Sequence, residues 1–220
     1  MTTYEQLEEE SALTILARWI VPAVIFIFVW WILPILLPTQ PFSWLLTDKA
    51  SWYLNRASGL VGYFLLALST IWGLLLSTKL VKKVVPPVLS LAMHNYLSWT
   101  AIGFSVLHAV VLLFDSYYAY TVGNLLIPFT GPYKPGWIGA GIIGFYIMLV
   151  TSASWYFRQH IGQKNWRRLH YLTFGAYGLT TFHGVMAGTD TSQLMPVYMG
   201  SAAVVIFLTM FRMIEAASDL

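Results

Sequence analysis

The sequence predicts an all-α integral membrane protein, built as a bundle of six transmembrane helices. Hydrophobic residues make up 58% of the 220 residues and charged residues only 10%, whereas soluble domains have about 45–50% and about 25%. This composition excludes soluble, disordered and nucleic-acid-binding proteins. The apolar residues also gather in runs close to the roughly 20 residues that a helix needs to cross a bilayer. The six runs are 19–37, 59–77, 91–114, 137–157, 169–187 and 195–211.

The distribution of charge predicts the direction of the spans. None of the 12 Lys and Arg residues and none of the 9 Asp and Glu residues lies inside the six runs. Lys and Arg near the ends of spans gather on the cytoplasmic side of membrane proteins. All but Lys49, Arg56 and Lys134 lie on one side of the predicted bundle, the side that also holds both termini. We therefore expect a multi-pass protein with cytoplasmic termini, surrounded by lipid, in a bacterial-type cytoplasmic membrane or an energy-transducing membrane derived from one.

The segments outside the runs leave no room for a separate soluble domain. Residues 1–18 are expected to form a cytoplasmic surface segment, residues 19–215 the membrane domain and residues 216–220 a short tail. The first run follows acidic rather than basic residues, so we expect a span and not a cleaved signal peptide. The long outer connections are 38–57 and 115–136, and the second, which contains several prolines, is expected to be an irregular cover.

Histidine is the residue type that carries chemistry here. The chain has no cysteine, which excludes disulfides, thiolate-bound zinc and iron–sulfur clusters held by this chain. Four of the five histidines lie inside runs, His94 and His108 in the third and His170 and His183 in the fifth. An ionisable residue inside a membrane is costly and marks a candidate functional site. Because the third and fifth spans cross in the same direction, His94 is expected level with His170 and His108 level with His183.

The spacing of the histidines points to haem. On a helix, the 14 residues from His94 to His108 correspond to about 21 Å of rise, and the 13 residues from His170 to His183 to about 19.5 Å. Each facing pair offers the two imidazole nitrogens that a six-coordinate haem iron takes. We therefore expect two stacked b-type haems between the third and fifth spans, one near each leaflet. A 13-residue interval leaves His170 and His183 about 140° apart around an ideal helix. A bulge or local unwinding is expected to correct this, at Gly175, Gly178, Thr180 or Thr181.

Other residues suit the surroundings of such a cofactor. Gly103, Gly175 and Gly178 lie between the histidines and would leave room for a flat macrocycle. Haem propionates are anionic and favour cationic partners at the water boundary. The cations near the expected haem levels are Arg56 outside and Lys164, Arg167 and Arg168, with His160, inside.

The histidine spacing and two short stretches resemble the ferric reductase-like transmembrane domain family. This family includes NADPH oxidases, ferric reductases and the bacterial haem subunit that serves methionine sulfoxide reductase. The stretch Trp166-Arg167-Arg168-Leu169-His170 is similar to the family's entry to the fifth span, and the arginine-led stretch at 56–60 to its entry to the second. The resemblance covers about residues 55–215.

The resemblance implies transmembrane electron transfer. It places an inner haem on His94 and His170 and an outer haem on His108 and His183, with electrons passing from the inner to the outer one. It also implies that Arg56 meets an outer propionate. Trp166 and Arg168 are the other cofactor-binding residues expected from the matched stretches.

The one stretch with GxGxxG spacing, residues 139–144, lies inside the fourth apolar run and not between a strand and a helix, so no flavin or NAD(P) site is expected. It would therefore receive electrons from a separate donor, such as a flavoprotein reductase, a quinol or a larger redox complex, as the membrane subunit of an oxidoreductase. Whether the chain is itself an enzyme stays open. One alternative is a haem-free structural or assembly subunit of a membrane complex. Another is a quinone-reactive cytochrome b, whose pocket would be lined by Asn95, Tyr96 and Ser98.

Overall fold

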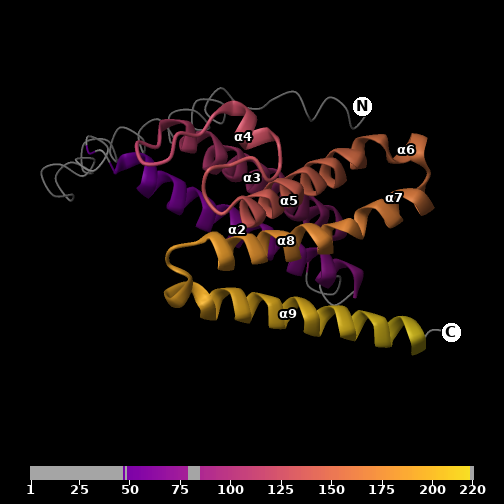
Figure 1. Cartoon of the computed structure of the whole chain (residues 1–220). Coiled ribbons are helices and arrows are strands. Elements are labelled where there is room, and N and C mark those ends of the chain that lie inside the picture. The colour runs from indigo at the N-terminus through magenta and orange to yellow at the C-terminus, as the bar shows by residue number, and fades with distance from the viewer. Residues whose placement is uncertain (1–46, 48, 79–84, 219–220) are drawn as a thin grey trace, which may run out of the picture. The chain divides into compact units, whose positions relative to one another are not determined.

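The computed structural model describes residues 47, 49–78 and 85–218. Within this part the chain is all-α, and Ser51–Leu220 form one compact unit. Figure 1 shows long helices running side by side, with a short helical hairpin at one end. The helices are α2 (Ala50–Ser77), α3 (Pro87–Val111), α4 (Val122–Leu126), α5 (Pro135–Ala153), α6 (Arg158–Ile161), α7 (Gln163–His170), α8 (Leu172–Ala187) and α9 (Thr191–Ser218), and short 3-10 segments follow α3 (Leu112–Phe114) and α5 (Ser154–Phe157).

Four of these helices are long and apolar enough to cross a membrane. They span Ala50–Ser77, Pro87–Phe114, Pro135–Ala153 and Thr191–Glu215. Large apolar side chains are exposed along them, among them Leu68, Val88 and Phe207. A soluble protein rarely exposes contiguous apolar surface on this scale. The architecture therefore indicates a multi-pass integral membrane protein with lipid-facing helices.

The expectation of six spans is met only in part. The first run, 19–37, lies outside the described residues. The fifth run, 169–187, is not one helix, because α7 ends at His170 and α8 begins at Leu172. With 16 residues, α8 is shorter than the roughly 20 residues of a full span. The described part of the chain thus shows four long spans and one shorter helix, α8, beside them.

The break at Tyr171 lies between His170 and His183, where the sequence predicts a distortion. Its position was predicted wrongly, since α8 is continuous through Gly175, Gly178 and the two threonines. The chain turns more tightly before them, because the Phe174 amide donates to the Tyr171 carbonyl three residues back, at 3.2 Å.

Several helices begin at a proline or a capping residue, and the helix ends differ from the ends of the apolar runs. Proline occupies the first helical position of both α3 and α5, where its missing N–H removes no helical hydrogen bond. α2 begins at Ala50, so Arg56 is helical rather than part of the outer connection that we expected over 38–57. The cover over 115–136 contains the short helix α4, which Thr121 and Asn124 cap reciprocally.

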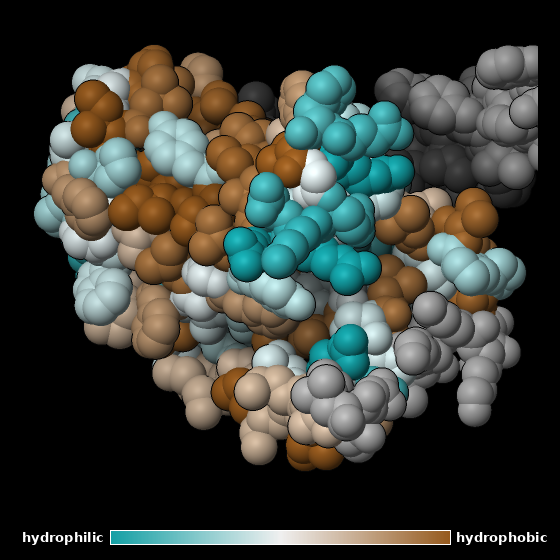
Figure 2. Space-filling view, turned by 90° about the vertical axis from the view of Figure 1, so that its right-hand side faces the viewer, coloured by the Kyte–Doolittle hydropathy of each residue, from teal (hydrophilic) through white to brown (hydrophobic). Residues whose placement is uncertain are grey.

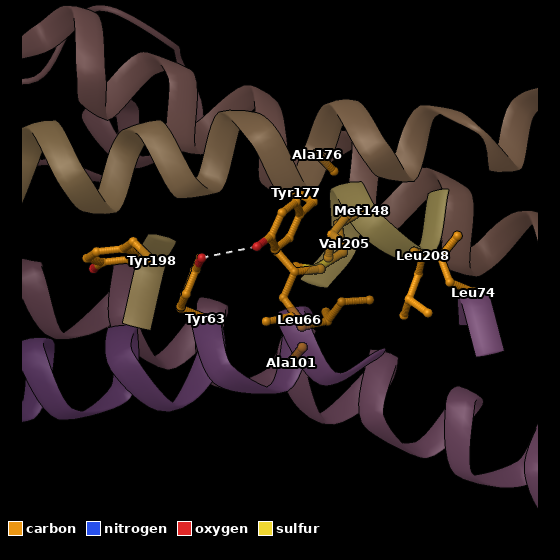
Figure 3. Close-up of a cluster of buried hydrophobic side chains, with 12 residues drawn as sticks. Tyr63, Leu66, Leu74, Ala101, Met148, Ala176, Tyr177, Tyr198, Val205 and Leu208 are labelled. Atoms are coloured by element: carbon orange, nitrogen blue, oxygen red, sulfur yellow. Dashed lines mark hydrogen bonds between the residues drawn. The ribbon is translucent and has the colours of Figure 1, made fainter. Parts of the chain in front are cut away.

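The spans pack through a common apolar core. Side chains from α2, α3, α5, α8 and α9 meet there, and Figure 3 shows them between the helices. α5 lies close along α8, because a Cβ on Gly144 would come within 3.0 Å of Thr180 Oγ1 and 3.3 Å of the Ala176 carbonyl oxygen. Small residues let membrane helices approach in this way. α5 is thereby the close neighbour of the helix that carries His183.

A hydroxyl cluster ties α9 to α2 and α8 inside this core. Ser201 Oγ lies 2.7 Å from Tyr63 Oη and accepts a hydrogen bond from Tyr177 Oη at 2.9 Å. The two phenol oxygens are 3.4 Å apart, and Figure 3 draws this contact. Ser201 in turn donates to the Tyr198 carbonyl oxygen at 3.1 Å. Interhelical hydrogen bonds of this kind hold helices together where lipid offers no hydrophobic driving force.

Candidate functional site

The four membrane histidines form two facing pairs. The ring centroids of His94 and His170 are 6.1 Å apart, and so are those of His108 and His183. The ring planes cross at 77° in the first pair and 78° in the second. Because the earlier histidine of α3 meets the earlier histidine of the α7–α8 segment, the two segments run in the same direction. The juxtaposition expected from spacing is thus present, while metal ligation by these residues stays a prediction.

The separation of the rings suits one metal ion between them. Metal–imidazole bonds are about 2.0–2.1 Å long, as zinc sites show. Adding the radius of each ring, slightly more than 1 Å, puts the centroids of two rings that ligate one ion from opposite sides roughly 6 Å apart. Both pairs have this separation. In the described part of the chain no group of three or more His, Asp or Glu residues gathers as a metal site, so the candidates are these two-nitrogen sites.

In three of the four rings, Nδ1 is hydrogen-bonded to a backbone carbonyl oxygen. His94 Nδ1 lies 3.1 Å from the Ser69 oxygen, His108 Nδ1 2.8 Å from the Asn55 oxygen, and His183 Nδ1 2.9 Å from the Trp137 oxygen. A carbonyl oxygen only accepts, so each Nδ1 carries the proton and donates. The lone pair is then on Nε2, as a metal ligand requires. Such second-shell bonds fix the ring and raise the basicity of the ligating nitrogen.

A glycine lies four residues after each of these carbonyls. A Cβ on Gly59 would come within 2.7 Å of His108 Nδ1, and one on Gly141 within 2.7 Å of His183 Nδ1. A Cβ on Gly73 would approach His94 Cε1 to 3.0 Å. The missing side chain therefore lets each ring lie against the neighbouring helix and reach the carbonyl one turn earlier. We call this arrangement, a carbonyl at one position and a glycine four residues later, the carbonyl–glycine seat.

The seats were missed by sequence reasoning, which considered only glycines on the helices that carry the histidines. A signal was present, however. Gly59 and Gly73 are separated by 14 residues, the same interval as His94 and His108. Two antiparallel helices with matching intervals bring both positions into register at once. The glycines predicted to leave room, Gly103, Gly175 and Gly178, have no heavy atom of another described segment within 4 Å of an added Cβ.

Arg56 has partners within the chain. Its guanidinium forms an ion pair with Asp190, donates to Thr189 Oγ1 at 2.9 Å and lies over the ring of Trp52 at 4.1 Å. Asp190 and Thr189 belong to the turn between α8 and α9. Arg56 thus connects α2 to the turn that follows His183, at the end of the bundle that holds the His108–His183 pair. Contact with a propionate stays a prediction for it.

At the other end, Trp166 lies against His170. The two rings stack with centroids 5.2 Å apart and an angle of 23°, and Trp155 meets Trp166 edge-on at 5.4 Å. Arg167, Arg168, Lys164 and His160 are exposed around this stack on α6 and α7. Figure 2 looks onto this end of the molecule and shows hydrophilic residues gathered among apolar ones. Trp166 is therefore brought to the inner pair, whereas the expected propionate contact of Arg168 stays untested.

The residues named for a quinone pocket do not converge. Ser98 Oγ lies 2.7 Å from Ser69 Oγ and donates to the His94 carbonyl at 2.9 Å, so it faces α2. The side chains of Asn95 and Tyr96 are exposed, Tyr96 to 71%. Helix packing accounts for Ser98, and exposure to lipid suits Tyr96.

No protein-family model matches the chain, and neither the curated proteins nor the solved structures contain a significant match.

Proposed function

We propose that the protein transfers electrons across a membrane through two b-type haems, each held by one of the histidine pairs. The observation that supports this most strongly is the pair of equal ring separations, 6.1 Å at both levels, each suited to one iron. A structural subunit without cofactor has no need for four ionisable residues placed in this way. The resemblance to the ferric reductase-like family, carried by the Trp166–His170 stretch, leads to the same proposal.

The protein's own residues would hold the cofactors rigidly and out of water. His94 and His170 would bind the inner haem, and His108 and His183 the outer one. A bis-histidine b-type haem supplies one-electron chemistry at an iron with no open coordination position, which suits electron transfer. The carbonyl–glycine seats would keep Nδ1 of His94, His108 and His183 protonated and leave Nε2 available to bind the iron. Two levels about 21 Å apart along α3 would carry an electron through most of the bilayer.

The donor is proposed to be a separate flavoprotein reductase, quinol or redox complex, because the GxGxxG stretch at 139–144 lies within helix α5 and not in a strand–helix loop. A membrane potential acts on an electron moving between the two levels with up to about 2.3 kcal/mol per 100 mV. Redox balance between the haems in sealed vesicles is therefore expected to shift with the applied potential.

Haem content tests the proposal directly. The purified protein is expected to carry two haems per chain and to show a b-type reduced-minus-oxidised spectrum. His108→Leu should remove one haem. His160→Leu is the matched control, since His160 is exposed on α6 and belongs to neither pair. A chain that folds without haem, or a His108→Leu variant that retains both haems, would contradict the proposal and favour the structural-subunit alternative.

A further inference from the structure

His170 differs from the other three membrane histidines in how it is held. It has no carbonyl–glycine seat, and its Nδ1 is buried without a hydrogen-bond partner among the described residues. His94, His108 and His183 each bond a carbonyl on a neighbouring helix, two on α2 and one on α5. The inner pair thus joins one tethered ring to one untethered ring, and the outer pair joins two tethered rings.

The helix that ends in His170 is also much shorter than the helix that carries His94 and His108. His170 is the last residue of α7, an eight-residue helix, whereas His94 and His108 lie within the 25-residue helix α3. Gly162, with φ of 81°, precedes α7, and the break at Tyr171 follows it. Positive φ favours glycine, and such a position ends a helix. α7 is therefore a short helix that begins after Gly162 and is followed by the break at Tyr171.

Trp166 supplies the contact that the hydrogen bond supplies elsewhere. It lies one helical turn before His170 on α7 and stacks on the imidazole at 5.2 Å. Aromatic pairs contribute through dispersion and quadrupole terms but impose no fixed tautomer. Trp166 and His170 share α7, and Trp155, in the 3-10 segment after α5, meets Trp166 and not the imidazole.

We propose that His170 is an exchangeable ligand, and that the inner site binds a small neutral molecule, such as carbon monoxide, in its place. This inference rests on the proposed function, since it requires haem at the histidine pairs. The exchange replaces one donor bond, from His170 Nε2, by one from the small molecule, with no net transfer of electrons or protons. Loss of an outer-shell partner typically lowers metal affinity 10–100-fold. The inner site therefore binds the molecule at least about 10-fold more readily than the outer site, whose two rings are both seated.

Carbon monoxide added to the reduced protein is the test. The expected result is a spectral shift of one haem equivalent per chain. A shift of neither haem, or of both to the same extent, would overturn the inference. Haem content, measured on the same sample, judges the proposed function separately. A protein without haem would contradict that function. Two haems of which neither binds carbon monoxide would contradict only the exchange of His170.

Paired variants identify the responding site. The double variant His108→Leu/His183→Leu keeps only the inner pair and is expected to respond to carbon monoxide. The double variant His94→Leu/His170→Leu keeps only the outer pair and is expected not to respond. The reverse pattern would place the exchangeable ligand in the outer pair and overturn the inference. The wild-type measurement decides the question even where a double variant fails to assemble.

Trp166 variants test how the ring is held. Trp166→Ala is expected to raise the rate of carbon monoxide binding several-fold, while Trp166→Phe, which can still stack, retains the wild-type rate. Total haem content provides a check that both variants assemble the inner site. Equal rates in the wild type and both variants would show that Trp166 does not hold His170, and would contradict this part of the inference.

Discussion

Asn55 and His108 bond each other twice, side chain to backbone in both directions. His108 Nδ1 donates to the Asn55 carbonyl oxygen at 2.8 Å, and Asn55 Nδ2 donates to the His108 carbonyl oxygen at 2.8 Å. Together with Gly59, this reciprocal pair forms the seat of His108 on α2. It fixes both the ring of His108 and the register of α2 against α3.

Asn55→Leu is expected to weaken the outer site without abolishing it. The variant removes the amide donor and leaves the His108 carbonyl unpaired, but the backbone acceptor for Nδ1 remains. Interhelical hydrogen bonds in membranes contribute about 0.6–1.7 kcal/mol, so the midpoint of thermal unfolding and the retention of the outer haem should both fall modestly. Asn165→Leu, on an exposed part of α7, is the control. An effect of the control as large as that of Asn55→Leu would contradict a specific role for the pair.

Substitution of the seat glycines is expected to displace the histidines they face. Gly59→Ala and Gly141→Ala put a methyl group within 2.7 Å of an imidazole nitrogen, so each should reduce haem content by one equivalent. Gly73→Ala meets a carbon at 3.0 Å and is expected to weaken only the inner site, to a smaller degree. Gly200→Ala, whose added Cβ meets no atom within 4 Å in the described part of the chain, serves as the control. Full haem content in Gly59→Ala and Gly141→Ala would show that the rings are not seated as described.

The level of each histidine along its helix could be predicted from sequence, because it follows from the rise of a helix. Intervals of 14 and 13 residues on two segments of the same direction bring the rings level, whatever fills the surroundings. The seats could not be predicted in this way, since a backbone carbonyl carries no signature in the sequence and a glycine in a membrane helix has many uses. The break after His170 was expected from the 140° mismatch, but its position was not, because Tyr171 is no obvious helix breaker.

Ser201→Ala is expected to loosen α9 from the bundle. The variant leaves the phenols of Tyr63 and Tyr177 without the hydroxyl that both contact at less than 3.0 Å, and a buried polar group left unsatisfied costs about 1–3 kcal/mol. The midpoint of unfolding in detergent should fall, and amide exchange in α9 should rise. Ser116→Ala, in the outer connection away from α9, is the comparison. Unchanged exchange in α9 would show that apolar packing alone holds this helix.

Variants of Arg56 and Asp190 are expected to shift the midpoint potential of the proposed outer haem in opposite directions. Their ion pair lies at the outer end of the bundle, where the resemblance implies an anionic propionate. Arg56→Gln removes a positive charge near the proposed outer haem, which favours the oxidised, more positive state and should lower the midpoint potential. Asp190→Asn removes the competing anion and leaves Arg56 free to meet the propionate, so it should raise that potential.

Potentiometric titration of the outer haem measures both shifts. The inner haem is the internal reference, because interactions between charges in water are screened beyond about 10 Å at 0.1 M salt and the two levels are about 21 Å apart. Arg212→Gln, at the opposite end of the bundle in an ion pair with Glu215, controls for the general loss of a cation. Shifts of the same sign in Arg56→Gln and Asp190→Asn would show that the ion pair acts on helix packing and not on the charge at the outer haem.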